Sequence, residues 1–172
     1  MGEHICFRRN ERLATVNPHW RGNPVVRGKF VNRQHRFRPG MGSVLKWRLS
    51  PNPQRKEKKS VKWSPKLNYL RSLDGVVGNS LIWLGHNSFF LQLGRKRIMF
   101  DPVFGDIPFV KRQSDFPANP DIFTDIDYLL ISHDHFDHLD KQSVARLVKN
   151  NPGMKLFCGL GTGELIKGWF PE

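Results

Sequence analysis

The sequence predicts an α/β fold, and three observations support this prediction. Short runs of β-branched and aromatic residues, separated by Gly and Pro, begin near Gly75. From residue 126 onward, strand, helix, strand and helix patterns follow one another, the order typical of α/β domains. The 172 residues, 38% of them hydrophobic, are enough for one domain with its own core.

The first strands are expected in the segment SLIWLGHNSFFLQLGRKRIMF. Runs at Leu81–Leu84, Ser88–Leu93 and Arg97–Phe100 have strand composition, and the Gly and basic residues at 94–96 suit a hairpin turn. Pro102 should end the third strand because it has no N–H to donate.

A fourth strand and a helix should follow. Ile126–Ser132 is an apolar run without alternation, which favours a strand covered on both faces. Asp140 is a suitable helix N-cap, and Val144, Leu147 and Val148 recur at helical spacing after it. The sequence NNPG at residues 150–153 should stop this helix.

The last strand and helix are predicted from shorter signals. Lys155–Gly159 has the composition of a short buried strand. Thr162 is the expected cap of a second helix, with Leu165, Ile166 and Trp169 on one side.

Charge divides the chain into two predicted domains, residues 1–73 and 74–172. Residues 1–70 hold 17 Lys and Arg against 3 Asp and Glu, a net charge of +14, whereas residues 71–172 are close to neutral. Residues 1–73 are therefore expected to form a basic, largely irregular extension, partly packed on the core, with a polar linker at Asn52–Ser60. Such an extension suits an anionic membrane surface, nucleic acid or solvent.

The composition favours a cytoplasmic protein, free or peripheral to a membrane. The longest apolar runs are far shorter than the roughly 20 residues of a membrane-spanning helix, and the first residues lack the apolar segment of a secretory signal. Only two cysteines occur, Cys6 and Cys158, which do not make a disulfide framework.

The stretch ISHDHFDHLD at residues 131–140 holds three of the seven histidines. It follows the predicted buried strand, and the carboxyl end of such a strand is where α/β folds usually place their chemistry. His133 and His135 are two apart and project to one side in extended backbone, whereas Asp137 and His138 follow after the chain turns. Imidazole and carboxylate ligands suit zinc and similar ions, so the stretch predicts a metal site.

These residues resemble a known family. His133, His135, Asp137 and His138 match the H-x-H-x-D-H signature of metallo-β-lactamase-fold metallohydrolases. Within that superfamily, the chain is most similar to the N-acylphosphatidylethanolamine-hydrolysing phospholipase D group and its bacterial relatives. The stretches that resemble this group are WLGHNSFFLQL at 83–93, IMFDPVF at 98–104, DYLLISHDHFDHLD at 127–140, LFCGLG at 156–161, and GKFVN with VLKW between residues 28 and 47.

The resemblance implies a fold, a reaction and residue roles. Residues 74–172 would form the N-terminal half of an αββα sandwich. His133 and His135 would bind one divalent ion, most naturally zinc, and Asp137 and His138 a second one. A hydroxide held by the ions would attack phosphorus or a carbonyl carbon, with Asp137 accepting a hydrogen bond from it and His86 near the metals without binding them. Asp101 would support the ligand loops.

The resemblance is incomplete, because members of the group supply further ligands from later loops and no histidine follows His138 here. We therefore expect a truncated form that leaves one face of its sheet uncovered, binds zinc weakly and hydrolyses little by itself.

Three alternatives to a phospholipase D-type phosphodiesterase remain open. The first is a lactonase or sugar-phosphate hydrolase of the same fold, and the second is a non-catalytic basic fragment that binds an anionic surface or RNA. The third, a nuclease of this fold, is disfavoured because such enzymes usually have glycine where this chain has Phe136.

Overall fold

The computed structural model describes residues 4–12, 17–32, 40–62, 65–107, 112 and 114–170. The chain divides into two compact units, residues 1–62 and 63–172. The sequence placed its domain boundary after residue 73, and that division stays a prediction. In the described residues, no helix is long and apolar enough to cross a membrane.

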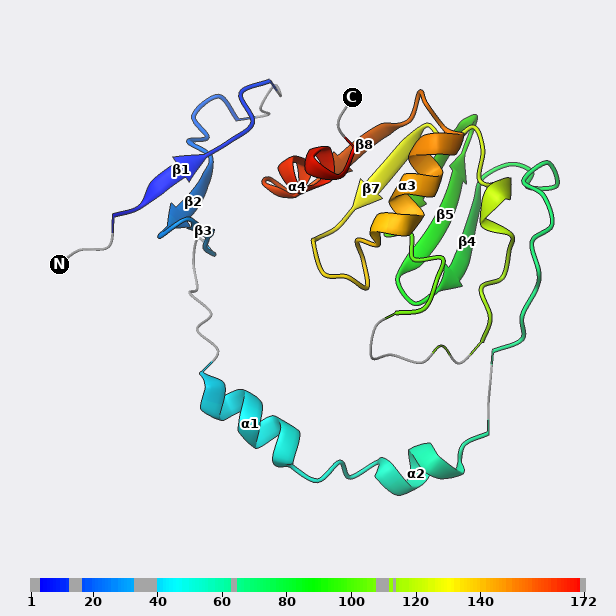
Figure 1. Ribbon diagram of the computed structural model, residues 1–172, viewed down its shortest axis with the longest axis horizontal. Helices are drawn as coiled ribbons and strands as arrows, with labels where there is room; N and C mark the ends of the chain where they lie inside the picture. Colours follow the sequence, from blue (N-terminus) through cyan, green and yellow to red (C-terminus); the bar gives the residue numbers. More distant parts are fainter. Residues whose placement is uncertain are drawn as a thin grey trace. The chain divides into compact units, whose positions relative to one another are not determined.

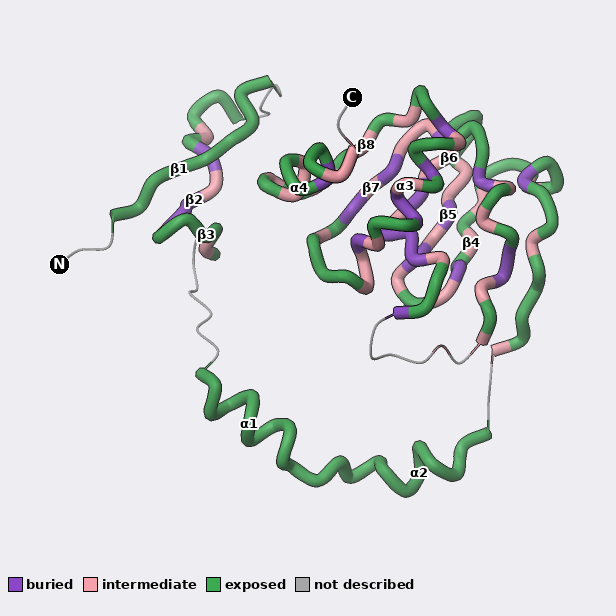
Figure 2. Tube along the Cα trace, in the orientation of Figure 1, coloured by how far each residue is buried: buried purple, intermediate pink, exposed green. Residues whose placement is uncertain are grey.

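The described residues of the first unit form five short elements within the extension expected to be largely irregular (Figure 1). Three antiparallel strands lie in the order β1-β2-β3, with bounds Cys6–Arg8, Asn23–Val26 and Lys29–Phe30. Helix α1 spans Met41–Leu49, and α2 spans Arg55–Ser60 inside the predicted polar linker. Neither helix buries a residue, as Figure 2 shows.

The second unit is built on a five-stranded sheet in the order β4-β5-β6-β7-β8. Strands β4, β5 and β6 form an antiparallel meander, whereas β7 and β8 run parallel to β6. The bounds of these strands are Ser80–Gly85, Ser88–Leu93, Lys96–Phe100, Tyr128–Ile131 and Lys155–Cys158. The structure therefore confirms the positions of all five predicted strands within one or two residues. Strand β8 is not buried as expected, because Lys155 and Phe157 are exposed.

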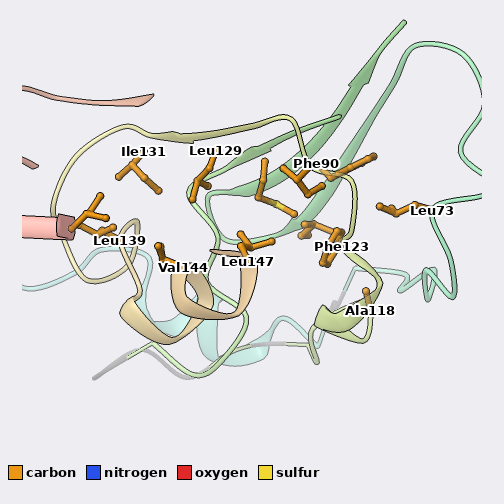
Figure 3. Close-up of a cluster of buried hydrophobic side chains, with 13 residues drawn as sticks. Leu73, Phe90, Ala118, Phe123, Leu129, Ile131, Leu139, Val144 and Leu147 are labelled. Atoms are coloured by element: carbon orange, nitrogen blue, oxygen red, sulfur yellow. The ribbon is translucent and has the colours of Figure 1, made fainter. Parts of the chain in front are cut away.

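One face of the sheet packs against helix α3, Lys141–Asn150, and the short 3-10 helix at Pro120–Ile122 (Figures 1 and 3). Phe90, Met99 and Leu129 come from three neighbouring strands and are fully buried. From the helix, Val144 and Leu147 meet them. Burial of each such side chain contributes about 1.5–3 kcal/mol, so this layer is the main source of the unit's stability.

The other face of the sheet is apolar and partly exposed. Alternation along each strand sends a second set of side chains to this side. The exposed fractions are 66% for Leu81, 54% for Trp83, 54% for Leu93 and 51% for Phe157. The expectation of an uncovered sheet face is therefore confirmed for the described residues.

The helix caps confirm one prediction and correct another. Asp140 accepts a hydrogen bond from the Ser143 N–H and caps α3 as expected. Helix α4 spans Thr162–Trp169, and its N-cap is Gly161 rather than Thr162. Gly161 has φ +90°, a backbone conformation that a β-branched threonine would adopt only with strain.

Candidate metal centre

Three chain segments converge at one edge of the sheet. Strands β6 and β7 are parallel and paired at Phe100 and Leu130, so the residues that follow them, Asp101 and Ser132, meet at the same edge. Strand β5 runs antiparallel to β6, and the β4–β5 turn at residues 85–87 therefore lies at that edge too. The histidine-rich loop, residues 132–139, follows β7 directly.

The β4–β5 turn directs His86 toward this edge. Gly85 has φ +99° and His86 φ +49°, so the turn uses two consecutive left-handed residues. For a non-glycine residue such as His86, the left-handed backbone conformation costs about 1 kcal/mol. The indole Nε1 of Trp83 donates to the His86 carbonyl at 2.9 Å and holds the turn closed.

His133 and His135 form the first pair of candidate ligands. Nε2 of His133 lies 3.1 Å from Nδ1 of His135, and the two rings are edge to face with centroids 4.5 Å apart. Two nitrogens that bind one tetrahedral ion at about 2.0–2.1 Å stand roughly 3.3 Å apart. The 3.1 Å separation therefore suits a shared ion, and Nε2 of His133 and Nδ1 of His135 are the candidate donor atoms.

His86, Asp137 and His138 form the second group. Each offers one donor atom, and these atoms lie within 4.8 Å of one another, which is close enough to hold a metal ion. Nε2 of His86 is 3.0 Å from Oδ2 of Asp137, and Nε2 of His138 is 3.8 Å from the same oxygen. The hydrogen bond from His86 lowers the pKa of the Asp137 carboxyl, which therefore stays ionised at neutral pH.

Asp101 connects the strand ends to the ligand loop. It is 8% exposed and has φ +38°, an unusual conformation for a non-glycine residue. Its carboxylate accepts the N–H of Ser132 at 2.7 Å and the hydroxyl of Ser132 at 2.6 Å. Oδ2 also lies 2.9 Å from Nδ1 of His138, so the same carboxylate holds the loop and one imidazole.

The structure brings together all the residues that the sequence predicted for the site, and their assignment as ligands stays a prediction. The expected pairs, His133 with His135 and Asp137 with His138, are both adjacent. His86 lies nearer the candidate metal position than expected, because it shares a donor group with the second pair. Asp134 is exposed, and none of the site contacts described above involves it.

Two participants were missed by sequence reasoning. Ser132 contacts Asp101, and its hydroxyl lies 2.9 Å from Nδ1 of His133. Asn87 places its amide nitrogen 2.9 Å from Nε2 of His138. The only sequence signal for Asn87 is its position directly after His86 in a turn, and the sheet register is needed to show that this turn meets the loop.

The donor set fits divalent metal ions. Imidazole nitrogens and a carboxylate are the ligands that zinc and similar ions prefer, and Asp101 holds His138 in the way that outer carboxylates hold ligand histidines.

Comparisons with known proteins agree with this donor set. Residues 96–172 match the β-lactamase superfamily domain. The chain is 28% identical over 160 residues to N-acyl-phosphatidylethanolamine-hydrolyzing phospholipase D 1 of Caenorhabditis elegans, covering 84% of this chain and 45% of that protein. It is 35% identical over 78 residues to a metal-dependent hydrolase of Saccharolobus solfataricus, covering 45% of this chain and 31% of that protein.

Among solved structures, a metal-dependent hydrolase from Parabacteroides distasonis superposes with a TM-score of 0.41 at 20% identity. The match covers 51% of this chain and 34% of that one. The chain thus spans less than half the length of these relatives. Residues 96–172 thus match the β-lactamase superfamily domain, and the relatives similar in sequence support the metallo-β-lactamase-fold superfamily for the second unit.

Proposed function

We propose that this chain forms part of a metal-dependent hydrolase that cleaves a phosphodiester of the phospholipase D type. The observation that supports this most directly is the pair of donor groups side by side, His133 with His135 and His86 with Asp137 and His138. Two divalent ions bound there, most naturally zinc, would supply an activated water and neutralise negative charge that develops on the substrate.

The side chains of the chain have separate roles in this proposal. Asp137 stays a carboxylate at neutral pH and can accept a hydrogen bond from the attacking water. While no ion is bound, Nε2 of His86 donates to Asp137 and fixes the direction of its oxygens. Asp101 holds His138 through Nδ1 so that Nε2 faces the site.

Arg112 favours an anionic substrate over a neutral lactone. Its guanidinium donates to the carbonyl oxygens of Val103 and Gly105, which fixes it beside the β4–β5 turn. A Cβ at Gly85, next to His86, would lie 3.3 Å from Nη1 of Arg112. A fixed positive charge at this place would attract a phosphodiester.

Metal content is the first test. We expect zinc to bind the His86 group more tightly than the His133–His135 pair, because three donors are available in one and two in the other. Elemental analysis of the chain should show zinc, with less in H133A/H135A and less again in H138A. H19A, which changes a histidine of the other unit, is the matched control. Equal zinc in all four proteins would contradict the proposal.

Turnover is the second test. At saturating zinc, the chain should cleave a chromogenic phosphodiester in preference to a lactone, at a low rate because so few ligands are present. Preference for the lactone would favour the alternative enzyme. Bound zinc without cleavage of either compound would favour a non-catalytic fragment.

We also propose that the first unit contacts an anionic membrane surface. In α1, Met41, Leu45 and Leu49 are four residues apart, share one side of the helix and are 58–83% exposed. Four of the six residues of α2 are Lys or Arg. Exposed apolar side chains beside basic ones are typical of segments that bind anionic lipid.

Vesicle sedimentation tests this contact. The chain should bind phosphatidylserine vesicles, bind neutral phosphatidylcholine vesicles weakly, and lose binding in L45A/L49A but not in V77A, which changes an exposed apolar residue of the second unit. Tight binding to RNA without vesicle binding would instead favour nucleic acid.

A further inference from the structure

Asn87 contacts the one ring nitrogen of His138 that the proposed metal needs. The amide nitrogen Nδ2 of Asn87 lies 2.9 Å from Nε2 of His138, and both residues are half-buried. The contact joins the β4–β5 turn to the ligand loop across 51 residues of sequence. It therefore exists only because the sheet register brings the turn to this edge.

The hydrogen bond at Nδ1 of His138 determines whether Nε2 donates to Asn87 or accepts from it. Nδ1 of His138 lies 2.9 Å from Oδ2 of Asp101. A carboxylate only accepts hydrogen bonds, and a neutral imidazole has one donor and one acceptor nitrogen. Nδ1 therefore holds the proton, and Nε2 is left as an acceptor with its lone pair directed at the Asn87 amide.

A metal ion would need that same lone pair. His138 belongs to the donor group with His86 and Asp137, and its Nε2 lies 3.8 Å from Oδ2 of Asp137. An N–H group and a cation cannot both use one lone pair, so binding of an ion at Nε2 requires loss of the hydrogen bond from Asn87.

We propose that Asn87 is a positioning residue that competes with the metal for His138. It holds the imidazole with Nε2 toward the site while no ion is bound, and it weakens metal binding by the free energy of the hydrogen bond that must be broken. This inference rests on the proposed role of His138 as a ligand and adds a residue that opposes metal binding, whereas Asp101 favours it.

The zinc affinity of N87A tests the proposal, because the proposal requires this variant to bind zinc more tightly than the unchanged chain. Removal of the amide should tighten zinc binding about fivefold in a chelator competition, the factor equivalent to a hydrogen bond of about 1 kcal/mol. N79A is the matched control, because Asn79 also bonds in a turn of this sheet, to the N–H of Gly94 at the opposite end. Thermal unfolding with EDTA shows whether each variant is folded.

A measurement without metal keeps the inference separate from the proposed function. In ¹⁵N NMR spectra of metal-free protein, N87A should move the His138 Nε2 resonance toward that of an unbonded, unprotonated ring nitrogen, and N79A should not. Unchanged or weaker zinc binding in N87A, or an unmoved Nε2 resonance, would overturn the role of Asn87. If H138A binds zinc as tightly as the unchanged chain while N87A moves the resonance, the metal role of His138 fails and the contact stands.

Discussion

Replacement of Asp101 by asparagine should weaken metal binding without unfolding the protein. Asparagine has the same shape and tolerates the left-handed backbone, here φ +38°, about as well as aspartate. Its amide oxygen can still accept the N–H of Ser132, which Asp101 Oδ1 accepts at 2.7 Å. The fold of the loop should therefore survive.

The expected loss follows from the chemistry at the second oxygen. Asp101 Oδ2 faces Nδ1 of His138 at 2.9 Å. An amide NH₂ at this position donates instead of accepting, so Nδ1 must become the acceptor and the ring proton moves to Nε2. The lone pair that should bind the metal is then lost from Nε2. Loss of such outer partners typically costs 10–100-fold in metal affinity, about 1.4–2.7 kcal/mol.

Chelator competition with zinc measures the change, and ¹⁵N NMR of metal-free D101N locates the ring proton. D140N is the control, because Asp140 lies in the same loop region but caps α3, a role that asparagine fills equally well. The reasoning is refuted if D101N binds zinc as tightly as the unchanged chain, or if its His138 keeps the proton on Nδ1.

Three further predictions concern stability and surface. The ion pair between Lys96 and Asp127 lowers the pKa of Asp127 and raises that of Lys96, so D127N should be less stable than the unchanged chain at neutral pH. The difference should narrow as pH falls through the lowered pKa of Asp127 or rises through the raised pKa of Lys96, as thermal unfolding across pH would show. L147A should lower the free energy of unfolding in urea by about 2–5 kcal/mol, because Leu147 is 1% exposed. V148A should lower it by under about 1 kcal/mol, because Val148 is 37% exposed. Equal losses in the two variants would show that Leu147 is not part of the core. L81K/F157K should reduce both the binding of an apolar dye and self-association, since both side chains lie on the uncovered sheet face; V77K, outside the sheet, should change neither.

The sequence by itself predicted the elements and the ligand types. Strong local signals explain this success: the β4–β6 strands have alternating or apolar runs with a Gly turn, and Asp140 precedes a helix of regular apolar period. The spacing of His133, His135, Asp137 and His138 is likewise local, so the sequence alone indicates that they lie close together. Their division into two ligand pairs is what the resemblance implies, and it stays a prediction. The cap of α4 was missed because Thr162 and Gly161 are both acceptable caps by composition, and the backbone angle decides between them.

The resemblance placed His86 and Asp101 near the candidate site, but only the tertiary structure decided which atoms they contact and that Asn87 joins them. His86, Asn87 and Asp101 are 37 to 51 residues from their partners, and they meet the loop because β5, β6 and β7 are neighbours in one sheet with a fixed register. Strand pairing is a long-range property that composition does not encode at a single position. Strand pairing therefore also fixes the contacts of individual atoms. Asp101 determines which nitrogen of His138 holds the proton, and the turn at residues 85–87 places Asn87 against the other nitrogen.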